Sequence, residues 1–126
     1  MRSKVYLKDE NGNIRKGKPI TVMNGPFNQE GTKECEQLLG SKTFSFPKPV
    51  SLISRFLSFT INSKSSKNDI ILDFFSGSST TAHAVMKLNA EDKGNRRYIQ
   101  VQLPEPCGEK TAAFKAGYSN LSLIHI

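Results

Sequence analysis

The clearest pattern in the chain is an apolar run that leads into small polar residues and then into a helical pattern, over residues 69–88. Residues 70–72 (Ile-Ile-Leu) are typical of a parallel strand that is covered on both faces. Asp73 ends this run, and residues 76–79 are all small. From Thr80 onwards apolar residues recur at helical spacing, at Ala84, Val85 and Leu88. The pattern therefore predicts a buried strand, a tight turn and a helix.

A second strand is predicted after this helix. Residues 98–103 alternate between apolar and polar side chains, Pro104 stops the alternation, and residues 89–95 form a charged loop before it. Strand, crossover helix and strand make one right-handed βαβ unit. Such units bind nucleotides at the carboxyl ends of their strands, where a polar side chain commonly meets ribose hydroxyls. Gln102 and Glu105 are the candidates for that contact.

Two further helices are predicted upstream of the first strand. Pro47 and Pro49 favour an extended approach, and Pro49 suits the first turn of a following helix. The apolar face expected for that helix consists of Leu52, Ile53, Phe56 and Leu57. Gly31-Thr32 precedes a shorter helix that ends at Gly40. We assign no chemistry to this shorter helix.

The amino-terminal segment predicts a β-hairpin, with strands at residues 5–7 and 20–22 and an Asn11-Gly12 turn. The basic stretch between these strands fits either a solvated loop or a loop that contacts phosphates. Towards the other end, residues 107–117 could hold a helix, and residues 121–126 form a short apolar end.

Composition and charge indicate which class of protein to expect. Only 37% of the 126 residues are hydrophobic, which is low for a self-sufficient core, so we expect a piece of a larger domain. The net charge of +7 suits a polyanionic partner, although Lys and Arg are spread along the chain. Cys35 and Cys107 lack CxxC spacing, which argues against a metal site or a disulfide framework. With no apolar run of membrane-spanning length and no signal-peptide pattern, we expect a cytoplasmic protein.

The turn after the first strand excludes two common phosphate-binding motifs. A Walker loop needs a lysine before Thr80, and a dinucleotide fingerprint needs three spaced glycines, whereas only Gly77 is present. A cofactor with one nucleoside and a small zwitterionic tail fits better. Its carboxylate would meet the helix start and its ammonium would meet Asp73.

At these residues the sequence resembles the modification (Mod) subunits of type III restriction-modification systems. These are β-class adenine-N6 DNA methyltransferases that use S-adenosylmethionine. The resemblance runs from about Asn28 to about Asn120 and rests on three motifs in order. They are Phe-Pro-Lys-Pro-Val (46–50), similar to motif X, Leu-Asp-Phe-Phe-Ser-Gly-Ser-Ser-Thr-Thr-Ala-His-Ala-Val (72–85), similar to motif I, and the stretch through Leu-Asn-Ala-Glu-Asp (88–92) and Asn-Arg-Arg-Tyr-Ile-Gln-Val-Gln-Leu-Pro-Glu (95–105).

The resemblance implies an α/β protein with a partial Rossmann-like, S-adenosylmethionine-dependent methyltransferase fold, preceded by a small β-hairpin segment. It implies that Asp73 meets the methionine amino group, directly or through water. The other cofactor-binding residues that we expect are Lys48, Pro49, Phe75, Gly77, Ser78, Thr80, Thr81 and Gln102, with the hydroxyl residues at the methionine carboxylate. Helix capping by the threonines, a strand-end cap at Asp73 and a solvated Lys48 remain alternatives. His83 is expected to pack or lie at the surface rather than to catalyse.

A departure from the family pattern in the turn and a missing motif affect this interpretation. The family usually has glycine where this chain has Ser79, and a positive φ there would cost serine on the order of 1 kcal/mol. The Asp-Pro-Pro-Tyr motif, which in this family holds the adenine amine and stacks on the flipped base, does not occur in the chain. It is expected upstream, so we assign no catalytic residue here.

The expected organisation is therefore a hairpin and connecting helix (1–40), a cofactor-binding part (41–120) and a truncated or frameshifted end (121–126). The resemblance implies double-stranded DNA, a restriction (Res) subunit and a second Mod subunit as partners of the complete protein, and no membrane or metal. Two other interpretations stay open: a methyltransferase that acts on RNA or a small molecule, and an inactive fragment that binds nucleic acid through charge alone.

Overall fold

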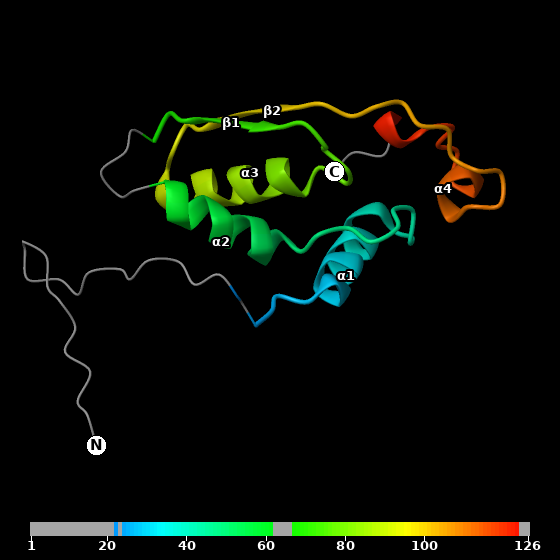
Figure 1. Ribbon diagram of the computed structural model, residues 1–126, viewed down its shortest axis with the longest axis horizontal. Helices are drawn as coiled ribbons and strands as arrows, with labels where there is room; N and C mark the ends of the chain where they lie inside the picture. Colours follow the sequence, from blue (N-terminus) through cyan, green and yellow to red (C-terminus); the bar gives the residue numbers. More distant parts are fainter. Residues whose placement is uncertain (1–21, 23, 62–66, 124–126) are drawn as a thin grey trace, which may run out of the picture.

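The computed structural model describes residues 22, 24–61 and 67–123. The predicted hairpin strands and their turn lie outside these residues, except for Val22, and so does most of the connection before the first strand. The elements are α1 (Asn28–Leu39), α2 (Val50–Thr60), β1 (Ile70–Asp73), α3 (Thr80–Asp92), β2 (Arg97–Gln100), α4 (Ala112–Lys115) and the short 3-10 helix η1 (Leu121–Leu123). The predicted α/β class is confirmed (Figure 1).

The two strands pair in parallel, and α3 connects them, as the βαβ prediction requires. Ile70 lies opposite Arg97 and Asp73 lies opposite Gln100. The ladder continues beyond the strands, because the Val101 N–H donates to the Asp73 carbonyl oxygen at 2.9 Å. The carboxyl end of β1 is therefore fixed against the chain that follows β2.

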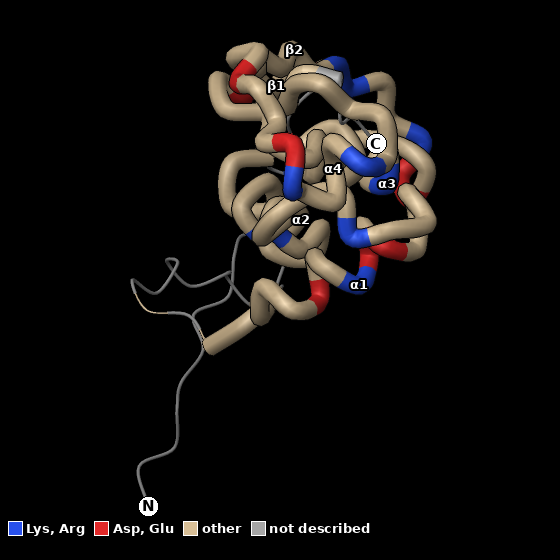
Figure 2. Tube along the Cα trace, turned by 90° about the vertical axis from the view of Figure 1, so that its right-hand side faces the viewer, with Lys and Arg blue, Asp and Glu red and all other residues tan. Residues whose placement is uncertain are grey.

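Helices α2 and α3 lie on the same side of the sheet, and α1 lies farther from it (Figures 1 and 2). The core between them contains Val50 and Leu57 from α2 and Ala84 and Val85 from α3, with Ile71 of β1 packed against it. The predicted burial of Leu57, Ala84 and Val85 is confirmed.

The prediction that Phe56 belongs to the buried face of α2 is wrong, because 46% of this residue is exposed. The buried positions of α2 are Val50 and Leu57, with Ile53 packed beside them. These residues recur three and four apart and so point to α3 on one stripe of the helix. Phe56 lies off this stripe and instead meets the ring of Phe59 edge to face.

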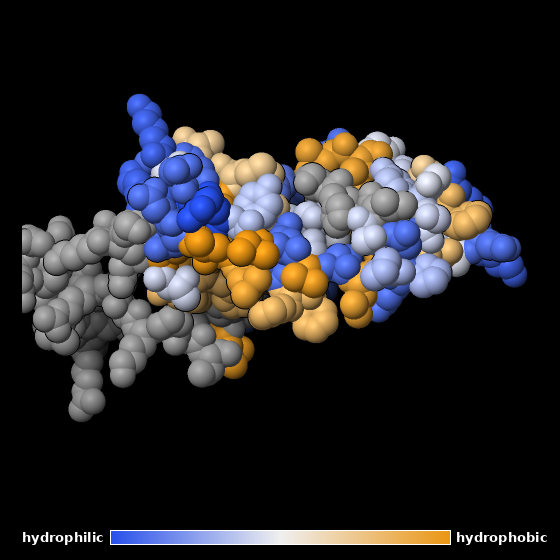
Figure 3. Space-filling model, turned by 90° about the horizontal axis from the view of Figure 1, so that it is seen from above, coloured by the Kyte–Doolittle hydropathy of each residue, from blue (hydrophilic) through white to orange (hydrophobic). Residues whose placement is uncertain are grey.

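The opposite face of the sheet is open, so the prediction that β1 is covered on both faces is wrong for the part of the chain that the structure describes. About half of Ile70, Leu72 and Ile99 is exposed, at 53%, 51% and 52%. Figure 3 looks onto this side and shows apolar side chains gathered there. An apolar run identifies a strand, but it does not tell whether both faces find a partner.

The bounds of two helices differ from the prediction. Helix α1 begins at Asn28 rather than after Gly31-Thr32, so Gly31 is a buried residue inside the helix. It ends before Gly40, whose φ of 70° confirms the predicted C-cap. Helix α3 runs to Asp92, so the first half of the predicted 89–95 loop is helical.

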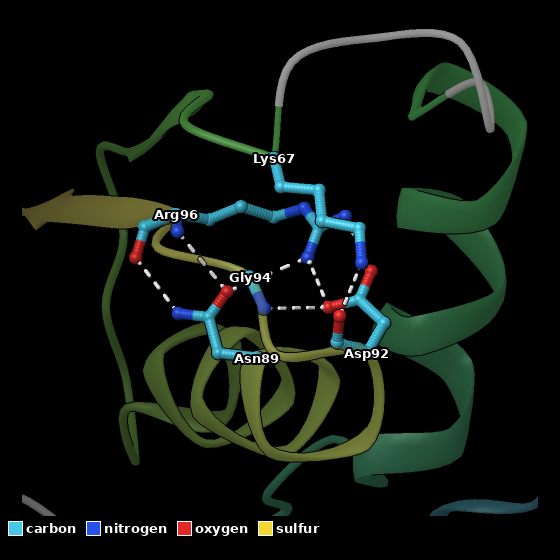
Figure 4. A network of polar contacts seen from close by, with 5 residues as sticks. All are labelled: Lys67, Asn89, Asp92, Gly94 and Arg96. Carbon is cyan, nitrogen blue, oxygen red and sulfur yellow. Dashed lines mark hydrogen bonds and ion pairs between the residues drawn. The ribbon is translucent and has the colours of Figure 1, made fainter.

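A polar network holds the connection between α3 and β2 (Figure 4). The buried guanidinium of Arg96 donates to both carboxylate oxygens of Asp92, at 2.9 and 2.8 Å. The Asn89 amide donates to the Arg96 carbonyl oxygen at 2.9 Å and accepts from the Arg96 N–H at 3.0 Å. Lys67, which precedes β1, donates to the Asp92 carbonyl oxygen. The network therefore joins the start of both strands to the end of α3.

This network predicts acid sensitivity. The hydrogen bonds from Arg96 hold the pKa of the Asp92 carboxyl below its ordinary value of 3.8. Because the pKa is lowered in the folded state, the stabilisation is complete above pH 3.8 and is lost as the pH falls through the lower, folded-state pKa. Urea unfolding at decreasing pH should show an Asp92→Asn chain that is less stable than the parent at neutral pH, with a difference that narrows in acid. A Glu91→Gln control should follow the parent, and parallel curves for Asp92→Asn and parent would contradict the assignment.

Candidate functional site

The candidate site is the turn between β1 and α3, at the carboxyl end of the sheet. Two of its residues have left-handed backbone conformations, Gly77 with φ 55° and Ser79 with φ 61°. The segment after β2 holds the turn, since the Ser76 N–H donates to the Val101 carbonyl oxygen at 3.0 Å. The Gly77 N–H donates to the side-chain oxygen of Gln102 at 2.8 Å. The turn is thus shaped by a contact 25 residues away in sequence.

Asp73 is fixed at the base of this turn. One carboxylate oxygen accepts from the Phe75 N–H at 3.0 Å, and the other accepts from the Thr81 hydroxyl at 2.6 Å. Each carboxylate oxygen has a further lone pair, so the group can still accept from a ligand. Asp73 therefore acts as a strand-end cap and remains available to an ammonium group.

A cavity of about 420 Å³ opens beside the turn. Most of the predicted cofactor-binding residues line it together, namely Lys48, Asp73, Phe75, Gly77, Ser78, Thr80 and Thr81. They come from two separate parts of the chain: the proline-rich segment, and the continuous stretch formed by the turn and the start of α3. The structure thus brings the predicted motif X and motif I residues to one cavity.

Two predicted residues lie elsewhere. Pro49 is fully buried at the N-cap of α2. Gln102 binds the Gly77 N–H and lines a different cavity, of about 460 Å³, with Ser79 and Tyr98. Glu105, the other candidate for a ribose contact, is exposed.

Sequence reasoning missed two aromatic residues of the site. Phe44 and Phe46 both line the 420 Å³ cavity, and Phe46 is 80% exposed with a φ of 59°. The Phe44 ring lies close to Gly77, because a Cβ added at that glycine would be 3.5 Å from it. Their position just ahead of the proline-rich segment, with Phe46 directly before Pro47, is the signal that could have identified them.

Charge at the cavity has both signs. The carboxylate of Asp73 lies on one side, while Lys48 and the start of α3 supply positive charge. The first N–H groups of a helix have no partner within the helix and attract anions. The hydroxyl of Thr80 donates to the Lys48 carbonyl oxygen at 3.0 Å and lies 2.9 Å from the Ser78 hydroxyl. The Thr80 hydroxyl therefore ties α3 to the proline-rich segment and also contacts the turn.

Ser79 occupies the position at which the family usually has glycine, and its φ of 61° meets the condition under which we expected serine to be strained. An L-residue pays roughly 1–2 kcal/mol in this conformation. The Ser79 hydroxyl lies 3.0 Å from that of Ser76, and both residues are buried. A Ser79→Gly substitution would relieve the strain but would also remove this hydrogen bond. That loss would offset about 1 kcal/mol of the stability gained.

Replacing both serines separates these two effects. The Ser76→Ala/Ser79→Gly chain should be more stable than Ser76→Ala alone by about 1 kcal/mol, because glycine relieves the backbone strain at this position. Urea unfolding of parent, single and double variants measures this difference. A double variant that is less stable than Ser76→Ala would contradict backbone strain as the dominant effect of serine at this position.

The two cysteines are free, as predicted. Burial raises the pKa of the Cys35 thiol, which makes it a poor nucleophile. Within residues 22, 24–61 and 67–123, no group of three His, Cys, Asp or Glu side chains could hold a metal ion. None of the helices in this same part of the chain is both long and apolar enough to cross a bilayer.

Comparison with known proteins gives the family. A family profile described as DNA methylase matches residues 4–105. The chain is 39% identical over 131 residues to the type III restriction-modification enzyme StyLTI Mod subunit of Salmonella typhimurium, which covers 95% of this chain and 20% of that protein. It is 34% identical to the type II methyltransferase M.KpnI of Klebsiella pneumoniae (97% of this chain, 29% of the relative) and 35% identical to the EcoP15I Mod subunit of Escherichia coli (94% and 17%).

The chain thus spans about a fifth of the length of the StyLTI subunit. The family match extends over all the residues that build the turn, the two strands and the 420 Å³ cavity. Both this match and the identity to Mod subunits agree with the resemblance of the sequence motifs. The chain belongs to the DNA methylase family.

Proposed function

We propose that this chain is the cofactor-binding part of a site-specific adenine-N6 DNA methyltransferase of a type III restriction-modification system. The observation that carries the proposal is the single cavity in which Asp73, Lys48 and the start of α3 meet. A zwitterionic amino-acid group needs an anion for its ammonium and a cationic or N–H-rich surface for its carboxylate. This cavity presents both.

The residues fit S-adenosylmethionine. When bound, this cofactor supplies an electrophilic methyl group. Asp73 would accept from the methionine ammonium, and the N–H groups at the start of α3 would meet its carboxylate, with Lys48 adding positive charge. The exposed rings of Phe46 and Phe75 would cover the ligand and exclude water. These residues bind and orient, and none of them activates the adenine amine.

We infer that methyl transfer needs groups outside this chain, because the chain has no Asp-Pro-Pro-Tyr motif. The β1–α3–β2 unit is the repeating unit of a Rossmann-like sheet, and two parallel strands form only part of such a sheet. We therefore propose that the complete protein adds strands, the catalytic motif and the surface that reads the DNA sequence. Double-stranded DNA, a Res subunit and a second Mod subunit are its proposed partners, in the cytoplasm.

The charge distribution supports a contact with DNA in the complete protein rather than by this part alone. The net charge is +7. Figure 2 shows blue and red residues interspersed on the side that it presents, without one continuous basic stripe. A strong, sequence-independent DNA site would concentrate its cations.

Calorimetric titration with S-adenosylmethionine tests the proposal, with ATP as a control that shares the adenosine but lacks the amino-acid group. We expect saturable binding of S-adenosylmethionine, no comparable binding of ATP, and no transfer of labelled methyl groups to duplex DNA by the purified chain. Equal binding of both compounds would remove the support that the cavity gives to an S-adenosylmethionine site. DNA binding that falls steeply with salt, without any response to S-adenosylmethionine, would instead favour a charge-based remnant.

A further inference from the structure

Helix α1 packs directly on the backbone of the proline-rich segment that carries Lys48. Gly31 is buried, and a Cβ added there would lie 2.5 Å from the Pro47 carbonyl oxygen and 2.6 Å from the carbonyl carbon of Lys48. Such distances exclude any side chain at this position unless the backbone shifts. The glycine therefore allows two main-chain segments to approach more closely than any other residue would permit.

A carboxylate of α1 also holds the start of α2. The Val50 N–H, the first of α2, donates to a carboxylate oxygen of Glu34 at 2.9 Å. The hydroxyl of Ser51 donates to Glu30 at 3.2 Å. Pro49 at the N-cap has no side-chain group that could satisfy these donors, and none of the first-turn residues of α2 is acidic. Glu34 therefore supplies from another helix the negative charge that favours this helix start.

Lys48 lies between this contact and the cofactor cavity. The Lys48 carbonyl oxygen accepts from the Thr80 hydroxyl of α3. The backbone of residues 47–49 contacts Gly31 of α1, and the chain then continues to Val50, whose N–H donates to Glu34. The main chain of Lys48 is thus held from two directions, by α1 and by α3. Its side chain lines the cavity.

We propose that Gly31 and Glu34 are positioning residues, which set the place of Lys48 in the cofactor cavity. The proposal rests on the proposed function in one respect, namely that the cavity holds S-adenosylmethionine. Neither residue lines that cavity. Both act through main-chain contacts with residues 47–50, so α1 belongs to the site although it contributes no ligand-binding side chain.

The test compares three variants of the 126-residue chain. Glu34→Ala leaves the Val50 N–H without its acceptor, Glu34→Gln keeps an acceptor oxygen at the same place, and Glu36→Ala removes an exposed acid from the same helix. We expect Glu34→Ala to bind S-adenosylmethionine about tenfold more weakly, as the loss of one hydrogen bond to a charged group allows. Glu34→Gln should restore most of the affinity, and Glu36→Ala should match the parent.

Amide hydrogen exchange supplies a readout that does not need the cofactor. In Glu34→Ala the Val50 amide should exchange about tenfold faster than in the parent, and the Thr80 hydroxyl contact should weaken with it, shifting the Lys48 amide resonance. Glu34→Gln should return both to parent values. A merely structural role would lower the unfolding temperature without this rescue at residues 48 and 50.

The outcomes separate the two proposals. If the parent binds no S-adenosylmethionine, the proposed function fails, and hydrogen exchange alone decides whether Glu34 positions Lys48. If the parent binds and Glu34→Ala matches Glu36→Ala in both affinity and exchange, the positioning role is overturned while the proposed function stands.

Discussion

Replacing Asp73 by alanine is expected to weaken the binding of S-adenosylmethionine severely. Asp73 is the acidic side chain that lines the cavity, and its carboxylate also holds the Phe75 N–H and the Thr81 hydroxyl. Removing one partner of a hydrogen-bonded charge pair costs roughly 2–5 kcal/mol, which corresponds to a loss of affinity of about thirtyfold or more. Isothermal titration calorimetry on the purified chain measures this loss.

Asparagine at the same position separates charge from geometry. Asp73→Asn can still accept from the Phe75 N–H, so the turn should keep its shape while the negative charge is lost. We expect Asp73→Asn to bind nearly as poorly as Asp73→Ala, and Glu91→Gln, an exposed acid near the far end of α3, to bind like the parent. If Asp73→Asn kept full affinity, Asp73 would serve only as a strand-end cap.

Replacing Gly31 by alanine is expected to cost a large amount of stability. The added Cβ would lie 2.5 to 2.7 Å from backbone atoms of Pro47, Lys48 and Pro49, which cannot swing away as the end of a side chain can. Overpacking of this kind costs about 1–3 kcal/mol, and we expect the upper part of that range. Thermal and urea unfolding measure the effect.

Gly108→Ala is the matched control, because its Cβ would meet only the Thr111 methyl group at 3.6 Å. We expect this control to be neutral or slightly stabilising, since alanine restricts the unfolded chain. Gly31→Ala should also weaken cofactor binding through Lys48. Equal stability of the two variants would mean that α1 can move away from residues 47–49 without cost.

Local sequence patterns predicted those parts of the fold that are determined by residues close together in the sequence. The apolar run, the small residues and the helical spacing identified β1, the turn and α3, and Gly40 identified the end of α1. The turn at 73–81 was predicted as a binding site because it follows the end of a strand, where parallel sheets place their sites, and the resemblance then implied the individual cofactor-binding residues within it. Lys48 was predicted to border the same pocket only because residues 46–50 resemble motif X.

The misses depend on contacts between distant segments. Gly31 can lie inside α1 because residues 47–49 pack there, and no local pattern contains that information. Gln102 turns to the Gly77 N–H because the chain after β2 runs beside the turn. Phe44 and Phe46 line the cavity through the path of the chain before Pro47. The open sheet face was missed because burial of a strand depends on which other elements are present.

The open face of the sheet also determines how this chain behaves in concentrated solution. Exposed apolar patches and strands whose outer edges meet no other strand in the described part of the chain are sites of self-association. Aggregation through Ile70, Leu72 and Ile99 would therefore set the upper limit on the protein concentration that can be used in calorimetry. Ile99 lines neither cavity beside the turn, so a lysine at this position would extend that range without altering the site.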